Sequence, residues 1–168
     1  MITDRQFRDK IVSMVTGKVF FNEPMSIHAS MGVGGIADAL IVPHTVDELK
    51  DLAALFLKEK VPFLPVGNCT NLIVGDGGYR GVLIALEALR RLEMRDEKGS
   101  ALKEGCDCGV CVYAQAGVSL PDMVNFSIRE SLTGLEFCAG IPGSVGGGVK
   151  MNAGAWGREI KDVVKSIS

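Results

Sequence analysis

The sequence lacks an excess of basic charge, a long apolar run and a recognisable export signal. Its formal net charge is −2, so no basic field is present to attract nucleic acid. No apolar run reaches the roughly 18 residues of a membrane helix. The first five residues, Met-Ile-Thr-Asp-Arg, lack the basic-then-apolar pattern of a signal peptide. We therefore expect a cytoplasmic protein that has neither nucleic acid nor membrane as a partner.

The sequence also lacks an even number of cysteines, which argues against a disulfide framework. Five cysteines are present, and Cys106, Cys108 and Cys111 form a C-x-C-x-x-C cluster. The cluster has no second cysteine pair and no histidine near it in sequence. Cys69 or Cys138 could complete a set of four ligands only if the fold brought them close. We expect no metal and interpret the cluster as reduced thiols at the end of a hairpin, with its role left open.

Glycine, by contrast, is abundant, with 21 residues, and it is concentrated between residues 134 and 157. Glycine inside a helix or strand costs roughly 0.5–1 kcal/mol relative to alanine, so neither element explains this run. Backbone that closely approaches a ligand does explain it, because successive amide groups can point at an anion. The run contains no lysine or arginine before Lys150, so amide dipoles would hold that anion. We interpret the run as a phosphate-facing loop.

Two other interpretations of the glycine-rich run are weaker. A flexible linker is rich in Gly and Ser without apolar anchors, whereas Val145 and Trp156 are among several apolar residues interleaved with these glycines. A P-loop requires the pattern G-x-x-x-x-G-K-[ST], but Lys150 here is followed by Met151.

The first half of the chain alternates apolar strands with amphipathic helices. Thr3 with Gln6, and Thr45 with Glu48, have capping-box spacing and predict helices at residues 4–16 and after Thr45. Short apolar runs predict strands at residues 38–43, 61–66, 72–74 and 81–86. The helix after Thr45 and its two flanking strands form a β-α-β unit.

This unit ends directly at the polar segment formed by residues 67–72, Gly-Asn-Cys-Thr-Asn-Leu. Ligands of β-α-β units bind at the carboxyl ends of the strands, which is where this segment falls. An ordinary turn favours the same residue types, so the segment by itself leaves both interpretations open.

A second glycine pattern, Gly32-x-Gly34-x-x-Ala37, matches the dinucleotide-binding fingerprint. That fingerprint follows a buried strand and opens a helix, whereas here the following residues predict a strand. We interpret the match as accidental.

The second half of the chain predicts a hairpin, a helix and a terminal strand. Residues 91–95 and 110–115 form the two arms of the hairpin. Ser119 and Asp122 have capping-box spacing and predict a helix that ends near Arg129. Residues 160–167 predict a strand with no partner after it.

Residues 66–74, V-G-N-C-T-N-L-I-V, resemble the G-x-G-S-N-L-L-V loop of the UDP-N-acetylenolpyruvoylglucosamine reductase family. Residues 134–147 and 151–160 are similar to that family's second signature, and the resemblance runs from about residue 22 to residue 164. It implies an α+β, two-lobed FAD-binding domain of the vanillyl-alcohol-oxidase type. The lobes would be residues 1–88 and an incomplete 89–168, without the carboxyl-terminal part and the substrate domain.

The resemblance also implies a cofactor and a reaction. FAD would place its pyrophosphate on the amides of residues 67–72 and 140–147. NADPH would supply the electrons that convert UDP-N-acetylglucosamine-enolpyruvate, a nucleotide sugar, to UDP-N-acetylmuramate for peptidoglycan. The residues expected to bind FAD are those of the two loops and their neighbours: Val66, Gly67, Asn68, Cys69, Thr70, Asn71, Leu72, Ala116, Gly117, Gly140, Ile141, Pro142, Gly143, Ser144, Gly146, Gly147, Asn152, Gly154 and Ala155.

The sequence departs from the family pattern at several points. Gly32 stands where the family often has a basic residue, and Cys69-Thr70 stands where it has a Gly-Ser pair. The family's catalytic residues lie beyond the position of Ser168, so no catalytic residue is expected here and the chain alone should lack turnover. The alternative is a flavin- or nucleotide-binding module without catalysis. Missing strands would leave an open sheet edge able to pair with another copy.

Overall fold

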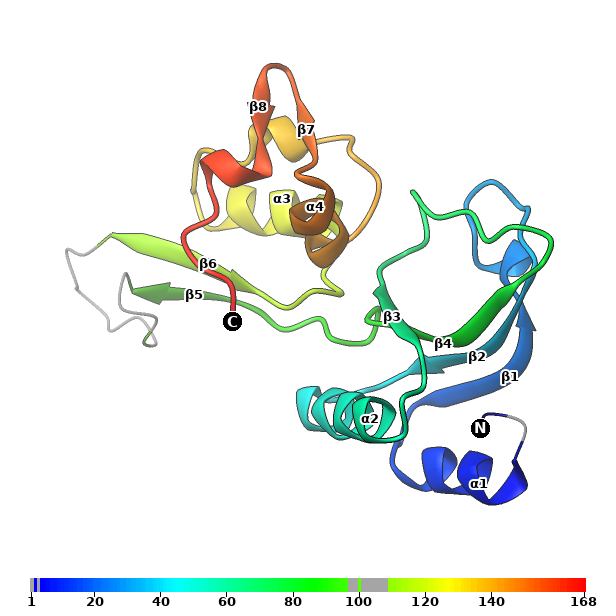
Figure 1. Cartoon of the computed structure of the whole chain (residues 1–168). Coiled ribbons are helices and arrows are strands. Elements are labelled where there is room, and N and C mark those ends of the chain that lie inside the picture. The colour runs from blue at the N-terminus through cyan, green and yellow to red at the C-terminus, as the bar shows by residue number, and fades with distance from the viewer. Residues whose placement is uncertain (1, 3, 97–99, 101–108) are drawn as a thin grey trace. The chain divides into compact units, whose positions relative to one another are not determined.

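The computed structural model describes residue 2, residues 4–96, residue 100 and residues 109–168. The chain divides into two compact units, Met1–Leu89 and Arg90–Ser168, which we call unit 1 and unit 2 (Figure 1). The boundary expected between residues 88 and 89 lies one residue before this division. Both units combine helices with strands, and the fold class is α+β.

Unit 1 is built on a four-stranded sheet of order β1-β2-β4-β3 (Figure 1). Strand β4 (Tyr79–Ala85) runs parallel to both neighbours, β2 (Ile36–Val42) and β3 (Phe63–Val66), whereas β1 (Lys18–Pro24) pairs antiparallel with β2. The predicted β-α-β unit is present as β2, α2 (Val46–Lys58) and β3. Its two strands are not adjacent, because β4 lies between them.

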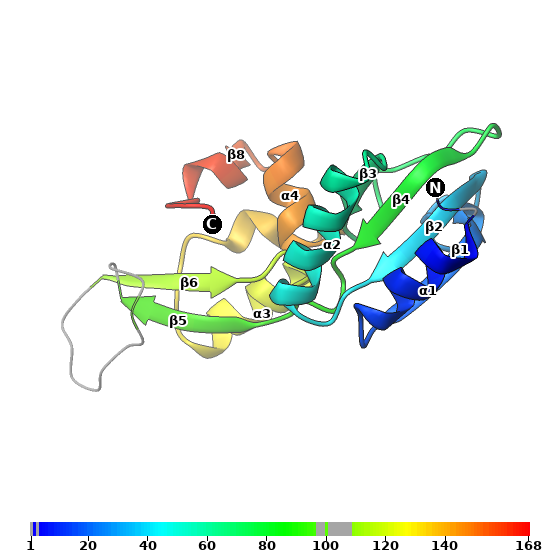
Figure 2. The ribbon, with the colours of Figure 1, turned by 60° about the horizontal axis from the view of Figure 1, so that its bottom comes forward.

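The two faces of this sheet bury separate apolar clusters. Helices α1 (Arg5–Ser13) and α2 cover one face, as Figure 2 shows. The cluster under the helices consists of Ile2, Ile11, Ala39, Ile41, Leu52, Leu55, Phe56, Val82 and Ile84. The cluster on the other face consists of Met25, Ala37, Leu40, Val42, Val66, Cys69, Val74, Leu83 and Ala85. Each large apolar side chain that is fully removed from water stabilises the fold by about 1.5–3 kcal/mol, so burial on both faces stabilises the sheet.

The helix caps of unit 1 are only partly those expected from sequence. Thr45 caps α2 as predicted, with Oγ1 accepting a hydrogen bond from Glu48 N at 3.1 Å. The cap of α1 is Asp4, whose carboxylate accepts from Phe7 N at 3.0 Å, so the prediction of a Thr3 cap is wrong, and Thr3 lies outside the described residues. Helix α1 also ends at Ser13, three residues before the predicted end.

The early end of α1 follows from a contact distant in sequence. Thr16 N and Thr16 Oγ1 donate to Glu48 Oε1 at 3.1 and 2.7 Å, and His44 N donates to Glu48 Oε2 at 2.7 Å. The carboxylate therefore joins the segment before β1 to the start of α2.

Residues 67–78 connect β3 to β4 without forming a helix or strand. The strand predicted at residues 72–74 is therefore wrong. Adjacent parallel strands require a long crossover connection, and β4 already has a partner on each side. The apolar character of this stretch serves packing instead, because Val74 is 9% exposed within the second cluster while Ile73 remains 60% exposed.

Unit 2 contains the predicted hairpin, formed by β5 (Leu92–Asp96) and β6 (Val110–Ala114) in antiparallel register. It also contains the predicted helix, α3 (Leu120–Arg129), in which Ser119 Oγ accepts from Asp122 N at 3.0 Å. The buried cluster of this unit consists of Val118, Leu120, Met123, Phe137, Cys138 and Ile160. Cys106 and Cys108 lie outside the described residues, and Cys111 is on β6.

The glycine-rich run does not remain irregular throughout, which corrects the expectation that helix formation could not explain it. Residues Val145–Met151 form the short helix α4, and Gly154–Ala155 pairs with Arg158–Glu159 as the small hairpin β7-β8. The remaining single-turn helices are η1 (Met25–Ile27), η2 (Glu136–Cys138) and η3 (Ile160–Asp162).

The strand predicted at residues 160–167 is also wrong. Helix η3 begins there because Glu159 and Asp162 form a reciprocal capping box, in which Glu159 N donates to Asp162 Oδ2 at 2.9 Å. Ile160 is 4% exposed and packs into the cluster of unit 2. Residues 163–168 form no regular element. Within the described parts of the chain, no helix has both the length and the hydropathy needed to span a membrane.

Candidate functional site

The first predicted loop, residues 67–72, follows β3 directly and is held at both ends. Val66, 8% exposed, is the last residue of β3, and its carbonyl oxygen accepts from Leu86 N at 3.0 Å. Cys69 is 8% exposed and packs into the cluster on the sheet face opposite the helices. Asn68, Thr70 and Asn71 are exposed. The loop thus has one buried anchor and otherwise faces solvent.

The backbone at Cys69 has φ +52°, in the left-handed region that favours glycine. Glycine adopts this conformation without strain, so the Gly-Ser pair implied by the resemblance would suit the same backbone. A side chain in the left-handed region costs about 1–2 kcal/mol. Burial of the Cys69 side chain offsets part of this cost.

The backbone amides of this loop are free to bind a ligand as far as the described residues go. Among the described residues, none accepts a hydrogen bond from the N–H groups of residues 67–71. Their neighbouring carbonyls are occupied, because Ser30 N donates to Cys69 O and Ser30 Oγ donates to Thr70 O, both at 3.4 Å. A row of exposed, unoccupied amides is the arrangement that fits an anionic ligand.

The second predicted loop, residues 140–147, divides into two parts. Gly140 and Gly143 have φ +85° and +128°, and within the described chain no acceptor is present for their amides or for the amide of Ser144. Ile141 N donates to Cys138 O at 3.1 Å, and Pro142 has no amide hydrogen. The first part of the loop therefore offers amides at residues 140, 143 and 144.

The second part of this loop is the start of α4, and its amides already have acceptors. Gly146 N donates to Ala116 O at 2.9 Å, and Gly147 N donates to the buried Ser144 Oγ at 3.3 Å. The prediction that these two amides face a phosphate therefore needs correction, since a ligand would have to displace both bonds. Gly117, beside Ala116, is buried.

The glycines of α4 have a packing role instead. A Cβ atom on Gly146 would lie 2.7 Å from Ala116 Cβ, and one on Gly148 would lie 2.7 Å from Ile160 Cδ1. Both distances are shorter than real contacts, so glycine is what lets α4 approach the segments on either side of it.

The last predicted residues, Asn152, Gly154 and Ala155, organise the β7-β8 hairpin. Asn152 ends α4 in the left-handed conformation, its Nδ2 donates to Glu159 Oε2 at 2.9 Å, and its Oδ1 accepts from Lys161 N at 3.0 Å. A Cβ on Gly154 would lie 2.5 Å from Arg158 O. Ala155 pairs with Arg158 across the hairpin. The side chain of Asn152 is thus fully used within unit 2.

A polar cavity of about 450 Å³ opens beside this hairpin. It is lined by Gly154, Ala155, Gly157, Arg158, Glu159, Lys161 and Asp162. Lys161 Nζ pairs with Glu159 Oε2. The hydrogen bond from the Lys161 side chain, followed by the one from Asn152, holds the pKa of Glu159 below its ordinary value. The charges of the lining residues balance, so the cavity has no net attraction for an anion.

No nucleophile is activated in the described residues that carry the loops. Burial raises the pKa of the Cys69 thiol, and the charge of Glu87 raises it further. Burial also raises the pKa of Cys138. Both thiols are therefore protonated near neutral pH, and neither is suited to attack a substrate. Among the described residues, no three His, Cys, Asp or Glu side chains gather in a metal-binding arrangement.

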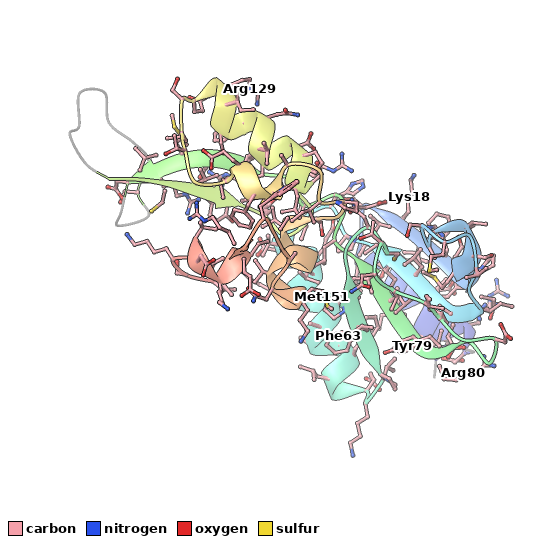
Figure 3. All side chains as sticks on the ribbon, turned by 90° about the horizontal axis from the view of Figure 1, so that it is seen from above. Lys18, Phe63, Tyr79, Arg80, Arg129 and Met151 are labelled. Carbon is pink, nitrogen blue, oxygen red and sulfur yellow. The ribbon has the colours of Figure 1, made fainter. Side chains whose placement is uncertain are left out.

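Tyr79 and Arg80 begin β4 (Figure 3), and Arg80 Nη1 pairs with Asp38 Oδ1 at 3.2 Å. Ser30 was not predicted from sequence, because a serine in a glycine-bearing segment is typical of any turn. Its two bonds to the first loop appear only in the fold.

Comparison with known proteins agrees with this geometry. A family model described as "FAD binding domain" matches residues 37–168. The chain is 49% identical over all of its 168 residues to the UDP-N-acetylenolpyruvoylglucosamine reductase of Syntrophus aciditrophicus, and covers 51% of that protein. It is 44% identical over 151 residues to the reductase of the same name from Caldanaerobacter subterraneus subsp. tengcongensis, with 90% of this chain and 46% of that protein covered.

Solved structures show the same relationship. UDP-N-acetylenolpyruvylglucosamine reductase from Thermus caldophilus matches with a TM-score of 0.59 and 31% identity over 85% of this chain and 44% of that chain. Cholesterol oxidase from B. sterolicum matches with a TM-score of 0.55 and 20% identity over 83% of this chain and 25% of that chain, which shows the fold alone. The fold is that of FAD-binding proteins of the vanillyl-alcohol-oxidase type.

The chain spans about half the length of the curated relatives it matches. The cofactor of the matched domain is FAD, whose diphosphate is an anion. Each unit, taken by itself, offers amides of the kind that can hold an anion: those of residues 67–71 in unit 1, and those of residues 140, 143 and 144 in unit 2. The chain belongs to the family whose model is described as "FAD binding domain".

Proposed function

We propose that this chain is the FAD-binding part of a reductase that uses NADPH to convert UDP-N-acetylglucosamine-enolpyruvate to UDP-N-acetylmuramate, a precursor of peptidoglycan. The observation that carries the proposal is the 49% identity to a named reductase over the whole chain. The unoccupied amides of the two loops supply the matching chemistry.

The loops have a defined task in this proposal. Residues 67–71 of unit 1, and residues 140, 143 and 144 of unit 2, would each supply backbone donors for the FAD diphosphate, while Val66 and Cys69 anchor the first loop on its sheet. Gly146, Gly147, Asn152 and Gly154 act indirectly, because they hold the second loop in shape through α4 and the β7-β8 hairpin. FAD, once bound, supplies the hydride chemistry, and the protein supplies binding and orientation.

No described residue of this chain is assigned to proton delivery. The side chains beside the loops are amides, hydroxyls and thiols without a lowered pKa, and none is a candidate acid. The proposed catalytic groups belong to the half of the curated relatives that the chain does not match. We accordingly propose that the chain alone has negligible turnover.

Two further features belong to the proposal. A cytoplasmic location is supported by the odd number of cysteines, which suits a reducing compartment. Pairing through a sheet edge is supported by β1 and β3, which flank the sheet of unit 1. Pro65 lies within β3, and because proline cannot donate to a ladder, β1 is the edge better suited to pairing.

The visible absorbance spectrum of the purified chain tests the cofactor, followed by identification of whatever is released on denaturation. A stoichiometric FAD signal is expected, either on purification or after added FAD. Complete failure to take up FAD would contradict the assignment of the loops. Assays with NADPH and the enolpyruvyl substrate then test whether the chain alone is active. Robust turnover by the chain alone would contradict the proposal that its turnover is negligible.

A further inference from the structure

We propose that Ser30 is a positioning residue for the cofactor loop, and that the glycine segment around it, residues 25–36, is the brace that holds residues 67–78 in place. This inference rests on the proposed function of the loop. The Gly32-x-Gly34 pattern lies within this segment, and it does not introduce a helix but leads directly into β2.

The brace meets the 67–78 connection at several points along its length. Near the start of the connection, Ser30 N donates to Cys69 O and Ser30 Oγ donates to Thr70 O. Farther along, Gly35 N donates to Val74 O at 2.9 Å. The two ends of the brace are joined to each other, because Met25 N donates to Gly35 O at 3.0 Å. The Met25 side chain is 1% exposed and anchors the brace in the core.

The brace and the connection also fit too closely for side chains on the glycines between them. A Cβ on Gly35 would lie 2.2 Å from Gly75 O, and a Cβ on Gly78 would lie 2.2 Å from Ile36 O. Both clashes are with backbone atoms, which cannot move aside. The connection has no helix or strand of its own, so these contacts are what define its path.

The direction of the Ser30 bonds explains why particular amides are exposed. In a trans peptide the C=O of one residue and the N–H of the next point in opposite directions. Ser30 draws Cys69 O and Thr70 O toward the brace, so Thr70 N–H and Asn71 N–H must point away from it. These are two of the amides without an acceptor in the described chain. Ser30 thereby orients donors for the ligand without touching the ligand.

Three single-residue variants of the full chain test this role. Ser30→Ala removes the hydroxyl bond to Thr70 O, and Ser30→Thr retains a hydroxyl. Ser26→Ala is the matched control, since Ser26 lies in the same segment and its side chain makes no hydrogen bond to residues 67–78 in the described structure. FAD affinity is measured by quenching of flavin fluorescence. The amide chemical shifts of Thr70 and Asn71 are measured by NMR without FAD.

We expect Ser30→Ala to weaken FAD binding about two- to fivefold, the effect of one weak neutral hydrogen bond, because the distance from Ser30 Oγ to Thr70 O is 3.4 Å. The amide chemical shifts of Thr70 and Asn71 should change, with the unfolding temperature nearly unchanged. Ser30→Thr should restore both properties, and Ser26→Ala should behave as the natural chain. A Ser30→Ala chain with unchanged FAD affinity or unchanged amide shifts overturns the positioning role. If the natural chain binds no FAD, the proposed function fails, and the amide shifts alone then decide whether Ser30 orients the loop.

Discussion

Residues 67–72 and residues 140–147 are both polar, glycine-bearing loops, but they use glycine differently. In the first loop the residue in the left-handed conformation is Cys69, and the unoccupied amides form a continuous row. In the second loop the amides of Gly146 and Gly147 are bonded internally, and Gly146 and Gly148 allow close contacts around α4. A glycine-rich sequence therefore indicates that the backbone closely approaches another group, which can be a ligand or another segment of the chain.

The two loops also differ in how they are supported. The first loop is anchored by Cys69 on the sheet and by a brace more than thirty residues away, at Ser30. The second loop is supported by Ser144 within it, by Ile160 shortly after it, and by the more distant Ala116. Substitutions can separate ligand contact from packing in each loop.

The largest effect is expected for Gly143→Val. At φ +128° a β-branched residue is strained, and the branch would cover the amides of residues 143 and 144. We expect loss of FAD retention, with circular dichroism nearly unchanged. Gly134→Val is the control, because Gly134 has φ +107° in the same unit but lies outside the predicted loop. Equal FAD occupancy in the Gly143→Val and natural chains would remove this loop from the site.

Gly146→Ala and Gly147→Ala separate packing from ligand contact within α4. The Gly146 Cβ would meet Ala116 Cβ at 2.7 Å, so we expect a loss of about 1–3 kcal/mol in the free energy of unfolding. The Gly147 Cβ would lie an ordinary 3.4 Å from Ser144 Oγ, and alanine in the helix should stabilise it by about 0.5–1 kcal/mol. Urea unfolding measures both values. Similar stabilities for the two variants would contradict the packing role of Gly146.

Glu48→Gln compares the long-range link of unit 1 with a local one in unit 2. Burial acts to raise the pKa of Glu48, but hydrogen bonds from the Thr16 side chain and from the backbone of His44, Thr16 and Thr45 outweigh it and lower the pKa. We expect Glu48→Gln to cost about 1 kcal/mol at pH 7, since the carboxylate is near the surface. Glu159→Gln, which removes a pair between near neighbours in sequence, should cost less.

The pH dependence of this loss has a definite sign. Because the folded pKa of Glu48 is depressed, its contribution is fully present above the ordinary glutamate pKa and disappears as pH falls through the lower, folded value. The difference between the natural chain and Glu48→Gln, followed by urea unfolding, should therefore shrink below about pH 4. A difference that stays constant to lower pH would show that the carboxylate charge is not what the bonds require.

The smallest effect is a gain in stability from Lys60→Gly in unit 1 and Ser131→Gly in unit 2. These residues follow α2 and α3 with φ +53° and +56°, the position at which helices favour glycine. We expect each variant to gain about 0.5–1 kcal/mol. Lys58→Gly, inside α2, should instead lose about 1 kcal/mol. Thermal unfolding measures all three, and a loss in Lys60→Gly would contradict the assigned strain.

Local hydrogen bonds made much of the fold predictable. Helices α2 and α3 begin at Thr45 and Ser119, whose side chains bond to amides three residues ahead, and such bonds can be recognised from spacing alone. The hairpin β5-β6 and the strands β2, β3 and β4 follow from apolar runs bounded by turns. The two loop signatures were long enough to indicate the family that the comparisons then showed.

Short apolar runs were the main source of wrong predictions. Residues 72–74 and 160–167 contain apolar residues typical of strands, yet they form an irregular crossover, and η3 followed by an irregular tail. A strand needs a partner with free backbone groups, and whether one exists depends on the arrangement of the rest of the sheet. In unit 1, β4 is already paired on both sides.

The sequence by itself determined the positions of α2, α3, the hairpin and the two loops, and through the loop motifs the FAD-binding family. Only the tertiary structure decided which amides are unoccupied, which glycines serve packing, and that Ser30 holds the first loop. The physical reason is range: caps and turns join residues a few positions apart, whereas Ser30 and Thr70, or Thr16 and Glu48, meet only after the chain has folded.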